Sequence, residues 1–169
     1  MTIWTIVAGS VGVVALLGAG TFLLPKTVHV QRQATLSAAP ETILALAASS
    51  EGYQAFNPYR TSDPDLKITP FGPVSGVGAG FRFDGKEGKG SQTVASVTAD
   101  SVRYDIDLGA MGRPVQTIST ASTPEGTQVV WSMDMDLGFN PVARVFGLFM
   151  DGMVGKTFEQ GLDNLAAAT

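Results

Sequence analysis

Residues 127–141 read TQVVWSMDMDLGFNP, and the order of polar and apolar side chains in them predicts how the domain folds. Apolar side chains recur at every second position (Val129, Trp131, Met133, Met135 and Leu137), and polar ones stand between them (Gln128, Ser132, Asp134 and Asp136). A period of two is typical of a β-strand with one face in the core and the other in water. Asn140 and Pro141 then favour a helix start, because asparagine caps N–H groups and proline suits the first helical position.

The helix that begins there is predicted to continue to about Ala167. Its larger apolar residues fall close to one stripe, formed by Val145, Phe146, Phe149, Met153, Leu162 and Leu165. We expect this stripe to cover the apolar face of the sheet.

Earlier segments show the same alternation and predict further strands: Lys26–Leu36, Leu66–Phe71, Gly80–Asp84, Gly90–Thr98, Val102–Leu108 and Val115–Ser122. Between the first two of these segments, a helix is predicted from Pro40 to about Ala48, with a break near Ser49 to Gly52 and a short aromatic segment after it. One apolar and one charged face indicate an antiparallel sheet covered on one side. The predicted fold class is therefore α+β: a helix-grip fold, in which a curved antiparallel sheet wraps on a long C-terminal helix.

The N-terminal run from Ile3 to Leu24 carries no charged side chain. As a helix it would measure about 33 Å, enough to cross a hydrocarbon core of about 30 Å. We expect residues 1–25 to form a transmembrane anchor and residues 26–169 to form one domain. A cleaved secretory signal is the alternative, but no Lys or Arg precedes the run and the run is long for a signal.

Charge and composition narrow the class of protein. The net charge is -4 and Lys and Arg form no stripe, so nucleic acid is not an expected partner. The chain has no cysteine, which excludes disulfides and thiolate metal sites. Lys26 and Arg32 follow the apolar run, which favours a single-pass membrane protein with its domain in the cytoplasm.

Five short segments carry a resemblance to a known family: residues 28–43, Tyr53–Pro58, Gly76–Phe81, Thr127–Trp131 and Phe158–Leu162. Together they resemble the START-like (SRPBCC) superfamily, and within it the polyketide cyclase/dehydrase and lipid-transport group. One departure is Tyr53–Pro58, where the group usually has a tryptophan before Asn-Pro. The resemblance covers nearly all of residues 26–167 and implies an elongated hydrophobic cavity between sheet and closing helix. Members bind sterols, phospholipids, quinones or polyketides, and only some are enzymes. Many bacterial members have a single N-terminal anchor, which implies a bacterial cytoplasmic membrane.

The sequence offers no strong catalytic, metal or cofactor site. The lone histidine, His29, has the parity opposite to Val28 and Val30 and is expected to face solvent. The aspartate pairs of the strands, Asp105 with Asp107 and Asp134 with Asp136, are expected on the same wet face. Gly76, Gly78 and Gly80 precede a predicted strand rather than a helix, which favours a tight turn over a dinucleotide site.

Large apolar side chains are the remaining candidates, as the lining of a ligand cavity. They are Phe56, Tyr59, Phe71, Phe81, Phe83, Tyr104, Trp131, Met133, Phe146, Phe149, Met150 and Met153. A filled core is the equally weighted alternative for them. Arg32 is the candidate for a polar group at the cavity mouth.

Three functions remain open. The preferred one is a membrane-tethered binding protein for a lipid-like or polycyclic apolar molecule, with the bilayer bound through Ile3–Leu24 and no cofactor. The second is a cyclase- or dehydratase-like enzyme on such a molecule, with Tyr104, Arg32 or His29 as proton donor or acceptor. The third is a scaffolding domain without a ligand. Ligand identity and oligomeric state stay open.

Overall fold

A computed structural model describes residues 23–169 of the chain. Seven antiparallel strands form one sheet in the order β1-β7-β6-β5-β4-β3-β2. The strands are β1 (Thr27–Leu36), β2 (Lys67–Phe71), β3 (Gly80–Gly85), β4 (Gly88–Val97), β5 (Ser101–Asp107), β6 (Val115–Thr123) and β7 (Gly126–Asp136). From β2 to β7, each strand pairs with the strand that follows it in sequence. The first strand, β1, pairs with β7 and forms one edge of the sheet.

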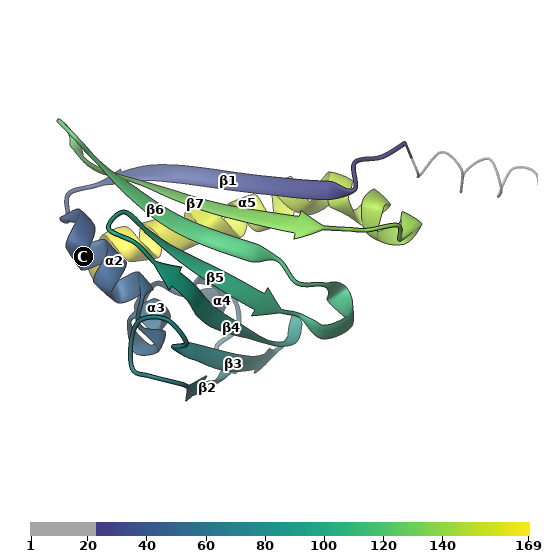
Figure 1. Cartoon of the computed structure of the whole chain (residues 1–169), viewed down its shortest axis with the longest axis horizontal. Coiled ribbons are helices and arrows are strands. Elements are labelled where there is room, and N and C mark those ends of the chain that lie inside the picture. The colour runs from purple at the N-terminus through teal and green to yellow at the C-terminus, as the bar shows by residue number, and fades with distance from the viewer. Residues whose placement is uncertain (1–22) are drawn as a thin grey trace, which may run out of the picture.

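One long helix and three short ones lie on a single side of this sheet. The long helix, α5 (Pro141–Ala168), runs behind the sheet in Figure 1. The short helices α2 (Pro40–Ala47), α3 (Ser50–Phe56) and α4 (Pro58–Ser62) follow β1 in sequence. They lie toward the end of the molecule opposite to the start of α5. A turn of 3₁₀ helix, η1 (Gly109–Met111), links β5 to β6. The predicted helix-grip arrangement, a curved antiparallel sheet with a long C-terminal helix, is confirmed.

Residues 50–62 were expected to contain the break near Ser49 to Gly52 and a short aromatic segment after it, but the structure has two helices there. These helices, α3 and α4, form because the chain supplies a new cap at each start. The Ser49 hydroxyl accepts a hydrogen bond from the Gly52 N–H, and the Asn57 side chain accepts one from the Tyr59 N–H. Capping of this kind begins a helix without a longer apolar period, which is why periodicity alone missed both helices.

The core is densely filled on the side of the sheet that faces α2, α3 and the second half of α5. Trp131 lies at its centre, with its ring stacked on Phe158 at a centroid distance of 4.9 Å. Phe56 and Tyr53 meet the same indole edge-on at 5.7 and 6.0 Å. These packed aromatics anchor the helices to the sheet.

The first half of α5 does not pack in the predicted way. Leu162 and Leu165 of the expected stripe are buried, but Val145, Phe146, Phe149 and Met153 are exposed. The reason is that a glycine of this half approaches the sheet: a Cβ at Gly147 would meet Leu137 and Val28. Glycine lets the helix lie close to the strands, and Val145, Phe149 and Met153 are turned away from the sheet.

The predicted anchor, Ile3–Leu24, lies outside the described residues except for its last two positions. Within residues 23–169, no helix is both long and apolar enough to cross a membrane. The start of the described chain is fixed to α5, because the Arg144 guanidinium donates a hydrogen bond to the Leu24 carbonyl at 3.3 Å.

Candidate ligand cavity

A cavity of about 250 Å³ opens between the sheet and the first half of α5. Its walls come from α3, α4, the segment that follows α4, strands β3 to β7, η1 and α5. The lining residues are Tyr53, Asn57, Tyr59, Ser62, Asp63, Leu66, Phe81, Phe83, Gly85, Lys86, Glu87, Gly88, Gln92, Ile106, Leu108, Met111, Pro114, Gln116, Met133, Met135, Phe146, Met150 and Val154. Most of these side chains are aliphatic or aromatic, which suits an apolar molecule.

Two buried amide side chains face the cavity from the sheet. Gln116 accepts a hydrogen bond from the Trp131 indole N–H at 3.1 Å, which fixes its orientation. Gln92 hydrogen-bonds the Tyr53 hydroxyl, and burial raises the pKa of that phenol, with this hydrogen bond opposing the rise. A wall of hydrocarbon with a few oriented amides can hold one polar atom of an otherwise apolar ligand.

The rim of the cavity is polar and carries charge. Burial, aided by the negative charge of Glu87, raises the pKa of Tyr59 to about 12, so this phenol stays protonated at neutral pH. Asp63 is buried and accepts hydrogen bonds from the backbone N–H of Lys86 at 2.8 Å and of Asp65 at 3.2 Å. The Lys86 N–H makes the largest contribution to lowering the pKa of this carboxyl. Asp63 therefore joins the segment after α4 to the β3–β4 turn.

Half of the predicted lining residues do line the cavity: Tyr59, Phe81, Phe83, Met133, Phe146 and Met150. Three others, Phe56, Tyr104 and Trp131, belong to the filled part of the core. The Tyr104 hydroxyl donates to the Ala47 carbonyl at 2.7 Å, which ties β5 to the end of α2. The interior is thus hollow at one end and filled at the other.

Three predicted lining residues lie elsewhere. Phe71 pairs with Gly80, and the Arg82 guanidinium lies 4.9 Å from its ring, so it is on the outer face of the sheet. The inward positions of β2 are instead Ile68 and Pro70, which pair with Phe83 and Phe81. Phe149 and Met153 are exposed on α5, because the glycines of that helix take the positions next to the sheet.

Arg32 is not part of the cavity lining. Its guanidinium donates to the Asp151 carboxylate at 3.0 and 3.1 Å and to Glu159 at 2.8 Å, all across the seam between β1 and α5. Gly155 leaves the room for it, since a Cβ there would collide with the guanidinium. The expected position at the cavity mouth is therefore wrong: Arg32 binds the helix to the edge strand.

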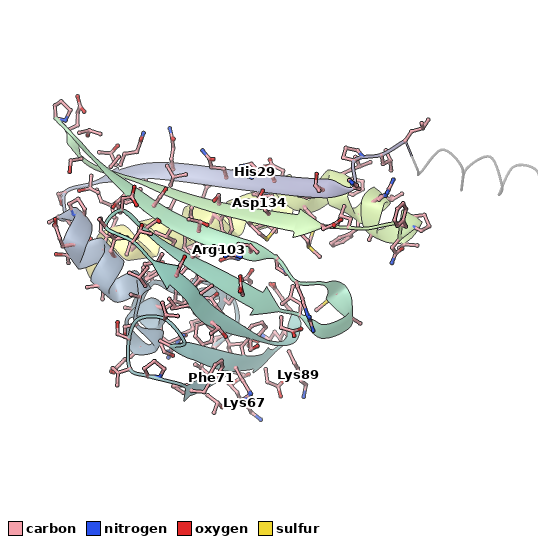
Figure 2. All side chains as sticks on the ribbon, viewed as in Figure 1. His29, Lys67, Phe71, Lys89, Arg103 and Asp134 are labelled. Atoms are coloured by element: carbon pink, nitrogen blue, oxygen red, sulfur yellow. The ribbon has the colours of Figure 1, made fainter. Side chains whose placement is uncertain are left out.

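His29 faces solvent, as predicted. Figure 2 shows it with Asp134 and Arg103 on strands that pass in front of α5, on the face away from the helix. The His29 Nδ1 lies 2.7 Å from the Asp134 carboxylate, and this hydrogen bond raises the pKa of the imidazole. None of the three proton donors considered for an enzyme, Tyr104, Arg32 and His29, reaches the cavity.

A model of one protein family matches residues 27–169, and its description is polyketide cyclase / dehydrase and lipid transport. The chain belongs to this family.

Solved structures share the fold of this polyketide cyclase/dehydrase and lipid-transport family member at low sequence identity. The di-domain ARO/CYC protein StfQ of the steffimycin biosynthetic pathway is 11% identical with a TM-score of 0.63, over 83% of this chain and 50% of StfQ. The chain thus spans about half the length of StfQ. The KanY protein is 16% identical with a TM-score of 0.63, over 83% of this chain and 96% of KanY.

A plant protein gives a similar match. Major latex-like protein 151 of Panax ginseng is 12% identical with a TM-score of 0.60, over 85% of this chain and 97% of that protein. Identities this low show a shared fold and leave the ligand of the family member open. No curated protein matches the sequence.

Several residues that line the cavity of this family member were not predicted from the sequence. Gln92 and Gln116 have the parity of the buried Val94 and Ile118, so alternation alone could have found them. Asp63 and Lys86 carry no such signal, because their contact depends on how α4 meets the β3–β4 turn. In residues 23–169, no group of His, Asp and Glu side chains is arranged to hold a metal ion.

Proposed function

We propose that the protein is a membrane-tethered binding protein for a lipid-like or polycyclic apolar molecule. The observation that carries the proposal is the cavity of about 250 Å³, with apolar walls, the amide of Gln116 oriented by Trp131 and the buried amide of Gln92. Cavities of this composition bury the hydrocarbon of a ligand and fix its orientation by a few polar contacts. Family membership supports the same class of ligand.

The size of the cavity limits the ligand. Pockets for small molecules typically measure about 300–1,000 Å³. A volume of 250 Å³ is just below this range, which favours a fused-ring compound or one acyl segment over a whole diacyl phospholipid. Met133, Met135 and Met150 give the walls adjustable side chains, so a somewhat larger ring system can enter by rotation of these thioethers.

The tether in this proposal is the uncharged run Ile3–Leu24, which is long enough to span a bilayer as a helix. Lys26 and Arg32 follow it, and this positive charge favours a cytoplasmic domain on a bacterial cytoplasmic membrane. A reporter fused after Thr169 tests the orientation. Activity of the reporter restricted to the compartment outside the cytoplasm would reverse it.

Energy transfer from Trp131 to a fluorescent polycyclic probe tests binding. Trp131 is the sole tryptophan of residues 23–169, and its indole N–H donates a hydrogen bond to the cavity residue Gln116. We expect saturable transfer from Trp131 to a pyrene probe, competed by unlabelled apolar compounds. Val154→Phe, which fills the cavity, should weaken it, and Val145→Phe, on the same helix but outside the lining, should not. Transfer unaffected by Val154→Phe would contradict binding in the cavity.

A cyclase- or dehydratase-like activity is the second candidate, and Tyr59 is the observation that favours it. This protonated phenol lies on the cavity wall and is able to donate a proton to a carbonyl oxygen of a bound polyketide. Tyr59→Phe separates the two functions. An enzyme loses turnover of a β-dicarbonyl substrate while it keeps the ligand, whereas a binding protein shows no turnover with either side chain.

A further inference from the structure

The first half of α5 exposes an apolar face that no other described element covers. Phe139 before the helix is 82% exposed, Val142 is 74% exposed and Phe149 is 61% exposed. Val145, Phe146, Leu148 and Met153 are also exposed along the same half of the helix. We call these seven residues the α5 apolar face. Soluble domains rarely leave so many large side chains together in water unless the surface has a partner.

This face has almost no charge of its own. Between Phe139 and Met153 the sequence contains two charged residues: Asp151, which is paired with Arg32, and Arg144. Its side chain is buried and donates hydrogen bonds to the carbonyls of Gly138 and Leu24, while its guanidinium lies 5.8 Å from the Phe139 ring. The positive charge is thus turned inward and the aromatic ring outward.

The end of the predicted anchor lies beside this face. Leu24 is the last residue of the uncharged run, and its carbonyl accepts a hydrogen bond from the guanidinium of Arg144 in the first turn of α5. Leu23 is 89% exposed at the same place. Pro25 and Lys26 alone separate this point from β1, a reach of about 7 Å at full extension. In Figure 1 the chain enters β1 at the end of the molecule where α5 begins.

We propose that the α5 apolar face, with Leu23, docks on the lipid surface of the membrane that holds the N-terminal run. The inference rests on the tether of the proposed function. A helix with Phe and Leu on one apolar face lies in the plane of the membrane interface and buries that face at the boundary between headgroups and acyl chains. A tether that ends at Leu24 brings this face to the bilayer without any long linker.

Docking in this way connects the cavity to the bilayer. Phe146 and Met111 each line the cavity and are about half exposed. Phe146 is also a member of the α5 apolar face, so its ring separates the cavity from the docked lipid. A ligand that passes Phe146 moves between acyl chains and the cavity without crossing bulk water.

Single-cysteine labelling of the full chain tests the docking. The chain contains no cysteine, so Phe139→Cys, Phe149→Cys and the control Val74→Cys each give one labelling site. Val74 is 82% exposed, like Phe139, but its loop bridges to Ser49 at the far end of α2. Each variant is labelled with nitrobenzoxadiazole and reconstituted in phosphatidylcholine vesicles with or without a nitroxide on the acyl chains.

We expect labels at positions 139 and 149 to emit at shorter wavelength and to lose most of their fluorescence to the nitroxide lipids. The label at position 74 should emit as in water and be little quenched. Equal quenching at all three positions, in a chain that floats with the vesicles, overturns the docking while the tether stands. Blue-shifted emission without nitroxide quenching also overturns it, because a second copy or the chain itself then covers the face. A chain that does not float with vesicles overturns the tether and the docking together.

Discussion

The guanidinium of Arg32 on β1 donates two hydrogen bonds to the Asp151 carboxylate on α5, at 3.0 and 3.1 Å. A third, at 2.8 Å, goes to Glu159 two turns later on the same helix. The side chain of Arg32 therefore links the edge strand of the sheet to the long helix. This contact holds α5 over the sheet at the boundary between its exposed first half and its buried second half.

The Arg32–Asp151 pair predicts a dependence of stability on acid. The hydrogen bond from Arg32 lowers the pKa of Asp151 below its ordinary value of about 4. The pair therefore stabilises the fold fully above that value, and the contribution is lost as the pH falls through the lowered pKa. We expect the stability difference between wild type and Asp151→Asn, measured by urea unfolding, to shrink from neutral pH to acid. A difference that stays constant over this range would contradict a role for the ionised pair.

Two glycines of α5 make a matched pair of substitutions. A Cβ at Gly152 would meet no neighbouring atom within 4 Å, so Gly152→Ala should raise the free energy of unfolding by about 1 kcal/mol through helix propensity. At Gly161 the same methyl group meets the ring of the buried Trp131. Overpacking of that kind costs about 1–3 kcal/mol, which exceeds the propensity gain. Gly161→Ala should therefore destabilise, as measured by thermal or urea unfolding, and stabilisation by both would disprove the close approach of α5.

Tyr104→Phe separates a structural role from a catalytic one. The change removes the hydroxyl that donates to the Ala47 carbonyl and leaves that buried acceptor without this donor. We expect a loss of about 1–3 kcal/mol in the free energy of unfolding. Affinity for an apolar probe, measured by energy transfer from Trp131, should not change, since Tyr104 lies outside the cavity lining. A variant of unchanged stability and weakened binding would place Tyr104 in the site instead.

The tyrosines predict a transition in base. The chain has three, Tyr53, Tyr59 and Tyr104, and burial raises the pKa of each. Their contribution to stability is complete below about pH 10, the ordinary pKa, and is lost as the pH rises through the higher values of the folded state. Phenolate absorbance should stay low at about pH 10 to 11 in the folded chain and appear fully in denaturant. Ionisation near pH 10 without unfolding would contradict the burial of these rings.

Much of the fold followed from the period of two in the sequence. The β-strand ends lie within about two residues of those predicted, because one face of each strand is dry and the other wet. The short helices α3 and α4 were not predicted, since they depend on the caps at Ser49 and Asn57 rather than on an apolar period. The face of α5 that packs on the sheet was also predicted incorrectly, because an apolar stripe does not reveal that glycines take the positions next to the sheet.

The candidate site was predicted only in part. Phe81, Phe83 and Met133 follow from strand parity, but Phe71 was assigned to the wrong face. Whether an inward aromatic lines a cavity or fills the core depends on its neighbours in space. Trp131 stacks on Phe158, 27 positions away in sequence, and no local pattern contains that contact.

Mass spectrometry of the apolar extract from the purified full chain tests directly whether the cavity binds a ligand. We expect one apolar compound, at about one molecule per chain, in the wild type. Val154→Trp should abolish it by filling the cavity, and Val145→Trp, on the same helix outside the lining, should retain it. An extract that holds only bulk membrane lipid, in the same amount from all three chains, would contradict the proposal that this cavity holds a ligand.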